Sequence, residues 1–188
     1  MAPRLFVITG PSGVGKGTLI AELLRRLPEL RLSVSATTRS PRPGEREGRE
    51  YHFLSAEEFD RLAREGAFLE HATYGGNRYG TLRSEVDREL AAGRSVVLEI
   101  EVQGARQVRA AVPESVQVFI APPAPGALRE RLEGRGTDAP EAIEERLRTA
   151  ERELAAQSEF PYVVVNDDVA RAAAELERIA RAELAADP

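Results

Sequence analysis

Short apolar runs alternate with amphipathic stretches along most of the chain. Four runs are continuous enough to predict strands buried on both faces: residues 5–8, 95–100, 116–120 and 162–165. Apolar residues recur at helical spacing in the stretches between and after them: residues 19–27, 102–112, 128–135, 140–157 and 169–184. This alternation predicts an α/β fold, with a parallel β-sheet core flanked by helices.

The pattern changes between about residues 35 and 85. The strands predicted there, after an alternating stretch at 31–35, are short and hairpin-like: residues 51–53, 68–74 and 78–81. A capping box formed by Ser55 and Glu58 begins a helix that ends near Gly66. We therefore expect a small mixed insert at about 35–85 on a core formed by 1–34, 86–133 and 147–188. The arginine-rich segment at about 134–146 resembles a lid.

A glycine-rich loop joins the first predicted strand to the first predicted helix. It consists of Gly10, Pro11, Ser12, Gly13, Val14, Gly15, Lys16, Gly17 and Thr18. Glycines let successive N–H groups point at one anion, and the helix N-terminus adds its positive dipole end. The strand–loop–helix setting predicts a phosphate-binding loop, against the alternative of a simple connecting turn. Lys16 would reach the outer phosphates as a point charge.

Lys16 is the only lysine in a chain whose other basic residues are all arginine. A slim ammonium group fits a tight anion loop better than a planar guanidinium does. The loop departs from the strict pattern in one place, because Gly17 and not a hydroxyl residue follows the lysine. Magnesium coordination is therefore open between Thr18, Glu99 and water.

Composition narrows the class of protein. The chain has 188 residues, enough for one domain with a sizeable core, and no cysteine for disulfides or thiolate chemistry. A net charge of −5 argues against nucleic acid as the main partner. No apolar run reaches membrane-spanning length, and the N-terminus lacks a charged-then-apolar signal pattern. We expect a cytoplasmic protein.

Several motifs together closely resemble those of guanylate kinases over nearly the whole chain. They are GPSGVGKGT at 10–18, SVSATTRSPRPGE at 33–45, YHF at 51–53, FLE at 68–70, RYGT at 78–81, RLEGRGT at 131–137 and VNDD at 165–168. The resemblance implies the P-loop nucleoside-monophosphate kinase fold, with a GMP-binding insert and a lid. It also implies transfer of the γ-phosphoryl group of ATP to GMP with Mg2+, in purine nucleotide metabolism.

The resemblance also implies roles for particular residues. The implied GMP-binding residues are Ser35, Arg39, Arg42, Tyr51, Glu70, Tyr79, Thr81 and Glu99. The implied ATP-binding residues are Arg131, Arg135, Asn166 and Asp167 with the loop at 10–18, and the implied catalytic residues are Lys16, Arg39, Arg135 and Arg146. Thr18 and Glu99 are the candidate metal ligands.

Residue chemistry supports several of these roles independently of the resemblance. A carboxylate at Glu70 would accept two parallel hydrogen bonds from guanine N1–H and its amino group, which adenine cannot supply. The planar forks of Arg39 and Arg42 match phosphate oxygens in pairs. The alternatives are a solvated strand-end carboxylate and a loop of scattered surface arginines. For Glu101, the sequence does not predict which group the carboxylate contacts.

Two other functions remain as competitors. One is a different nucleoside-monophosphate kinase, such as an adenylate kinase, whose loop also reads GKGT. The other is a guanylate-kinase-like interaction module without catalysis, against which the intact loop with Lys16 argues. The sequence leaves the oligomeric state open between a monomer and a homodimer.

Overall fold

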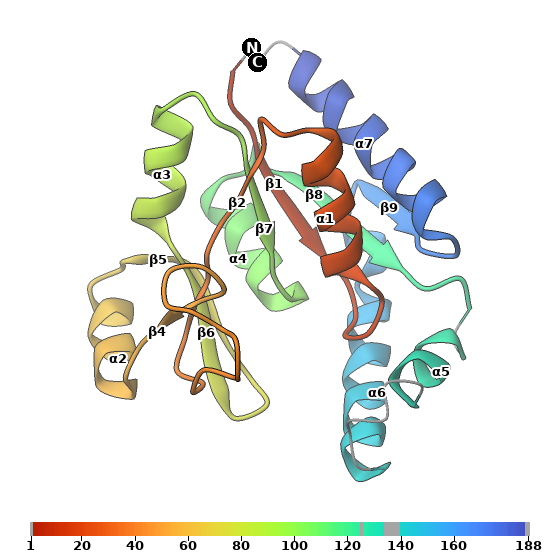
Figure 1. Cartoon of the computed structure of the whole chain (residues 1–188), viewed down its shortest axis with the longest axis horizontal. Helices are drawn as coiled ribbons and strands as arrows, with labels where there is room; N and C mark the ends of the chain where they lie inside the picture. Colours follow the sequence, from red (N-terminus) through yellow and green to blue (C-terminus); the bar gives the residue numbers. More distant parts are fainter. Residues whose placement is uncertain (1, 125, 134–139, 187–188) are drawn as a thin grey trace.

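The computed structural model describes residues 2–124, 126–133 and 140–186 (Figure 1). Its strands are β1 (Leu5–Thr9), β2 (Arg31–Leu32), β3 (Ala36–Thr37), β4 (His52–Phe53), β5 (Phe68–Tyr74), β6 (Asn77–Leu82), β7 (Val96–Glu99), β8 (Val116–Ala121) and β9 (Tyr162–Val165). Its helices are α1 (Lys16–Arg26), α2 (Ala56–Arg64), α3 (Arg83–Ala91), α4 (Val102–Ala111), α5 (Ala127–Glu133), α6 (Pro140–Ala155) and α7 (Val169–Ala185), with a 3-10 turn at Gln157–Glu159.

The core is a parallel five-stranded sheet in the order β2-β7-β1-β8-β9. Alternate residues of β1 enter two separate apolar clusters: Phe6 and Ile8 pack toward α1 and α7, whereas Leu5 and Val7 pack toward α3 and α4. Because both faces are covered at the centre of the sheet, β1, β7 and β8 are mainly apolar. The edge strand β9 was predicted to be buried on both faces, and this is wrong, because Val163 and Val165 are exposed. The predicted parallel core and its helical flanks are confirmed.

A second sheet, β4-β3-β6-β5, is built by residues between the first and second halves of the core (Figure 1). Its β5 and β6 form an antiparallel hairpin, β3 pairs antiparallel with β6, and β4 pairs parallel with β3. A small apolar cluster of Ala36, Phe59 and Phe68 attaches α2 to this sheet. The Ser55 hydroxyl accepts a hydrogen bond from the Glu58 amide, as the capping box predicted.

One predicted strand is wrong as a single element. Residues 31–35 do not continue as one strand, because the backbone changes sheets inside the segment. The Ser33 amide bonds to the Val97 carbonyl of the core, while the Ser35 carbonyl accepts from the His52 amide of the second sheet. The segment is therefore the crossing point between the two sheets.

Helix α4 of the core also contacts the second sheet directly. The Gln107 side chain accepts a hydrogen bond from the His71 amide at 3.1 Å and donates one to the His71 carbonyl at 2.9 Å. These two bonds fix the outer strand β5 against the core on one side of the cleft.

Positions 134–139, six of the thirteen predicted lid positions, lie outside the described residues. Positions 140–146 belong to α6, whose buried Ile143 and Ala150 share one side of the helix. Within the described ranges, no helix has the length and apolar character needed to cross a membrane.

Candidate active site

The loop after β1 wraps tightly before α1 begins at Lys16. Gly13 and Gly15 have φ angles of 85° and 95°, in the left-handed region that side chains other than glycine rarely adopt. At Gly15 the space is also occupied, because a Cβ atom would lie 2.6 Å from the Asn166 side-chain nitrogen. The predicted strand–loop–helix arrangement of a phosphate-binding loop is present.

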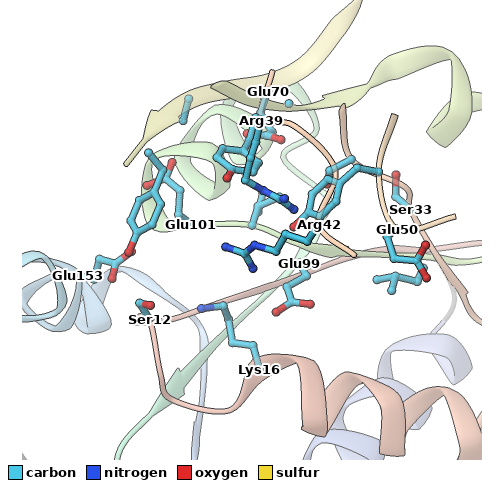
Figure 2. Close-up of a pocket in the computed structure, with 18 residues that line it drawn as sticks. Ser12, Lys16, Ser33, Arg39, Arg42, Glu50, Glu70, Glu99, Glu101 and Glu153 are labelled. Carbon is cyan, nitrogen blue, oxygen red and sulfur yellow. The ribbon is translucent and has the colours of Figure 1, made fainter. Parts of the chain in front are cut away.

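Lys16 sits at the mouth of this loop. Its ammonium group donates to the Gly10 carbonyl at 2.6 Å and lies 3.3 Å from the Pro11 carbonyl. Burial lowers the pKa of Lys16, while Glu153 and Glu99 act in the opposite direction. The site therefore places a positive charge beside the loop, with carboxylates around it (Figure 2).

Two of the residues assigned to ATP hold the loop from behind. The Asn166 amide donates to the Val14 carbonyl at 2.7 Å, and Arg131 donates to the same carbonyl at 3.0 Å. A second Arg131 nitrogen donates to the Asn166 carbonyl at 2.7 Å. Asp167 pairs with Arg171 at the start of α7. Arg131 and Asn166 thus brace the loop in this structure.

Helix α6 presents two charged groups to Ser12 of the loop. An Arg146 nitrogen donates to the Ser12 hydroxyl at 2.7 Å, and the Ser12 amide favours the charged form of the Glu153 carboxyl group. Glu153 is buried, and this burial raises its pKa to about 7. The sequence analysis missed Glu153, although a carboxylate beside the apolar positions 150 and 154 was a usable signal. Arg135, the other lid candidate, lies outside the described residues.

A cavity of about 420 Å³ joins the loop to the second sheet (Figure 2). Its walls bring together all the predicted GMP-binding residues except Thr81, which are Ser35, Arg39, Arg42, Tyr51, Glu70, Tyr79 and Glu99. Ser12 and Lys16 of the loop line it too, with Glu50, Glu101 and Glu153 among the further residues. Thr18 is exposed on the first turn of α1 and is not part of this lining.

Glu70 is a buried carboxylate on β5, with only 5% of its surface exposed. The Thr81 hydroxyl donates to Glu70 Oε1 at 2.7 Å from the paired strand β6. The other oxygen faces the start of α4, where a Cβ atom on Gly104 would lie 2.4 Å away. Burial raises the pKa of Glu70 to about 7 against the opposing Thr81 hydrogen bond. Ionisation of a carboxyl group this enclosed is costly unless further hydrogen-bond donors reach it.

Arg39 and Arg42 come from the loop after β3. Arg39 pairs with Glu45 at 2.9 Å and lies over the Tyr51 ring, with its guanidinium carbon 5.3 Å from the ring centroid. The rings of Tyr51 and Tyr79 meet edge-on, 6.1 Å between centroids. Figure 2 shows the Arg42 guanidinium directed into the cavity above Lys16. Guanidinium and phenol donors therefore converge on one wall.

Two acidic residues at the end of β7 have different surroundings. Glu99 is exposed to the cavity, where desolvation raises its pKa and Lys16 partly offsets the shift. Its carboxylate oxygens lie 3.7 Å from the position of a Cβ atom on Gly17. Glu101 caps α4 by accepting hydrogen bonds from the Gly104 amide at 2.7 Å and the Gln103 amide at 3.0 Å. The sequence left the contact of Glu101 undecided, and in the structure its carboxylate caps the N-terminus of α4.

These residues fit a divalent cation held mainly by a ligand. The described residues contain no group of three or more metal-binding side chains. Mg2+ typically binds through one or two carboxylates together with substrate phosphates and water. Glu99 beside the phosphate loop supplies one such oxygen donor.

Comparison with known proteins gives a consistent result. The family model described as guanylate kinase matches residues 2–183. A guanylate kinase of Parasynechococcus marenigrum (strain WH8102) is 57% identical over 173 residues, which cover 92% of this chain and 95% of that protein. One from Thermobifida fusca (strain YX) is 57% identical over 166 residues, covering 88% and 85%.

A solved structure is similar as well. The crystal structure of guanylate kinase from Anaplasma phagocytophilum superposes with a TM-score of 0.79 at 33% sequence identity. The match covers 98% of this chain and 88% of that one.

Proposed function

The chain belongs to the guanylate kinase family, and we propose that it transfers the γ-phosphoryl group of ATP to GMP, giving ADP and GDP. One observation on the chain itself supports this proposal. Lys16 of the phosphate loop lines one side of a cavity, and the buried Glu70 lines the other side together with Arg39 and Arg42. A buried carboxylate matches the two donors of guanine, whereas adenine presents an acceptor at N1.

Glu70 is proposed to bind the guanine base. Its carboxylate would accept hydrogen bonds from guanine N1–H and the amino group, while Thr81 holds one of its oxygens in place. Adenine presents an acceptor at N1 and would leave the buried carboxylate unpaired. Such a mismatch discriminates between substrates by about 10⁴-fold. Ser35 lines the same cavity and supplies a hydroxyl for the base.

Arg39 and Arg42 are proposed to bind the GMP phosphate. Guanidinium forks bind phosphate oxygens in pairs, and the Tyr51 and Tyr79 hydroxyls add two donors from the same wall. Glu99 lines the cavity between these donors and Lys16 and adds an acceptor for GMP. Arg39 would exchange part of its pairing with Glu45 for the phosphate.

The donor triphosphate is proposed to bind in the loop at residues 10–18. Lys16 would leave the loop carbonyls and contact the outer phosphates, and Arg146 would add a second cation from α6. Arg131 and Asn166 contribute by holding the Val14 carbonyl, which keeps the loop amides in place. Asp167 follows β9, near the expected adenine position. Arg135 is proposed as a further donor-side cation from the resemblance alone.

The reaction needs no side-chain nucleophile. A GMP phosphate oxygen is already anionic at neutral pH, so catalysis is positioning for in-line transfer plus neutralisation of charge on the transferred group. Lys16, Arg39, Arg135 and Arg146 are the proposed catalytic cations. Closure of an insert at about 35–85 and a lid at about 134–146 over the core would exclude water and limit ATP hydrolysis.

Mg2+ is the proposed cofactor, with Glu99 and Thr18 as the nearest candidate ligands, directly or through water. When bound, the ion would neutralise charge on the phosphates of ATP. The acidic donor at Glu99 lies next to Gly17, and Thr18 follows on the exposed turn of α1.

A comparison of acceptors tests the proposal. Steady-state turnover with ATP and each of GMP, AMP, UMP and dTMP should show a strong preference for GMP. Faster turnover with AMP would reject the guanine assignment. No product together with tight binding of phosphopeptides would instead identify an interaction module.

We also propose that the enzyme acts in the cytoplasm, as a monomer or homodimer.

A further inference from the structure

Two oppositely charged side chains of α6 lie at the same residue of the phosphate loop, Ser12. Arg146 and Glu153 are seven residues apart, two helical turns, so they share one side of the helix. Arg146 binds the Ser12 hydroxyl at 2.7 Å, and the Ser12 amide favours the charged form of the Glu153 carboxyl group, whose pKa it lowers. Arg146 is an expected partner of a phosphate, whereas Glu153 carries the charge that a phosphate repels.

Glu153 is an unusual neighbour for an anion-binding loop. It is 8% exposed, and its Oε2 atom has no hydrogen-bond partner among the described residues. Two other charged groups from packed elements act on it: Lys16 from α1 attracts it, and Glu101 at the start of α4 repels it. Its carboxylate lines the same cavity as Lys16 and is stabilised in its charged form by a loop amide and by the charge of that lysine, two groups that also suit a terminal phosphate.

We propose that Glu153 competes with the donor's terminal phosphate for the Ser12 amide and Lys16, so that donor binding drives a proton onto Glu153. The inference rests on the proposed function, because it assumes a triphosphate in this loop. Protonation replaces a second negative charge at the loop by a neutral carboxyl group that can donate to a phosphate oxygen. Glu153 is thus a positioning residue whose proton is linked to ATP binding.

The pH dependence follows from the raised pKa of Glu153, about 7. At pH 6 the group is already mostly protonated and opposes binding little. At pH 8 it is mostly ionised, so the apparent affinity for the donor falls about tenfold relative to the protonated form. At that pH, binding takes up about 0.9 proton per site.

The test measures the dissociation constant of the β,γ-imido analogue of ATP, with Mg2+, for wild type and Glu153→Gln at pH 6 and pH 8. Glu153→Gln should bind about tenfold tighter than wild type at pH 8 and about equally at pH 6. Glu151→Gln removes the same charge from an exposed position of α6 and should match wild type at both. Titration of the nucleotide itself cancels in these ratios.

Equal or weaker binding by Glu153→Gln at pH 8 would overturn the inference. Should the variant fold poorly, calorimetry of the wild type in two buffers of different ionisation enthalpy still decides, and absence of proton uptake at pH 8 would overturn it. A wild-type protein that does not bind the analogue at pH 6 would refute the proposed donor site itself.

Discussion

Replacement of Glu70 by glutamine should have two opposite effects. Glutamine keeps the size of the side chain but removes its charge. Glu70 is only 5% exposed, and its carboxylate accepts one hydrogen bond from the Thr81 hydroxyl. The folded protein should become more stable at high pH, because a buried carboxylate is no longer ionised. GMP binding should collapse, because the amide cannot accept both hydrogen bonds from guanine.

The stability effect follows from the pKa of Glu70, raised by burial from 4.5 to about 7 in the folded protein. A raised folded pKa favours folding below pH 4.5, and this advantage is lost as pH rises through 7. We therefore compare the free energy of unfolding of Glu70→Gln with that of wild type at each pH. The variant's advantage should be about 2 kcal/mol larger at pH 8 than at pH 5. Urea denaturation at the two pH values measures this difference.

The binding effect follows from two hydrogen bonds to a charged acceptor, each contributing about 1.5–3 kcal/mol, of which glutamine loses one and leaves only a neutral acceptor for the other. The dissociation constant for GMP should rise by about 10²–10⁴-fold, measured by calorimetry at pH 8. Glu114→Gln, an exposed substitution after α4, should change neither quantity. Wild-type GMP affinity in Glu70→Gln, or a stability gain equal at both pH values, would refute the reasoning.

Three further predictions concern the loop and the second sheet. Lys16→Met should lower kcat by about 10²–10³-fold while leaving GMP affinity unchanged, and an equal loss of GMP affinity in calorimetry would contradict it. Gly15→Ala should lower the free energy of unfolding by more than Gly66→Ala does. In both variants, the left-handed backbone conformation alone costs alanine about 1–2 kcal/mol. Both glycines have positive φ, but only at position 15 would the Cβ atom meet Asn166, so equal losses in denaturation would count against steric contact. Partial burial lowers the pKa of His52, but hydrogen bonds to two glutamates raise it above 6.5 overall. His52→Ala should therefore cost most stability below pH 6.5, with the cost shrinking as pH rises through the folded pKa, and a pH-independent loss in thermal melting would exclude this ion-pair role.

Local patterns were sufficient to predict the loop and most elements. The glycine spacing before Lys16 and the apolar strands depend on neighbours in sequence, and the structure confirms both. The pairing of Glu70 with Thr81 follows from a hairpin whose Gly75–Gly76 turn was visible in the sequence. These features require little knowledge of how distant segments pack.

Features that depend on tertiary packing were less predictable. The alternation at 31–35 could not reveal that the chain leaves one sheet for another, because both halves have the same periodicity. Bracing of the loop by Arg131 and Asn166 depends on where α5 and β9 end in space. The apolar positions beside Glu153 indicated its burial, but its closeness to the loop could not be predicted, because Ser12 lies far away in sequence.

The two bonds between Gln107 and His71 have a consequence for self-association. Strand β5 is the outermost strand of its sheet, and such an edge is normally a template for another chain to add a strand. The carboxamide of Gln107 offers β5 one donor and one acceptor, as a neighbouring backbone would, and so occupies the middle of that edge. A single side chain from the core thereby protects this border from intermolecular β-pairing and aggregation.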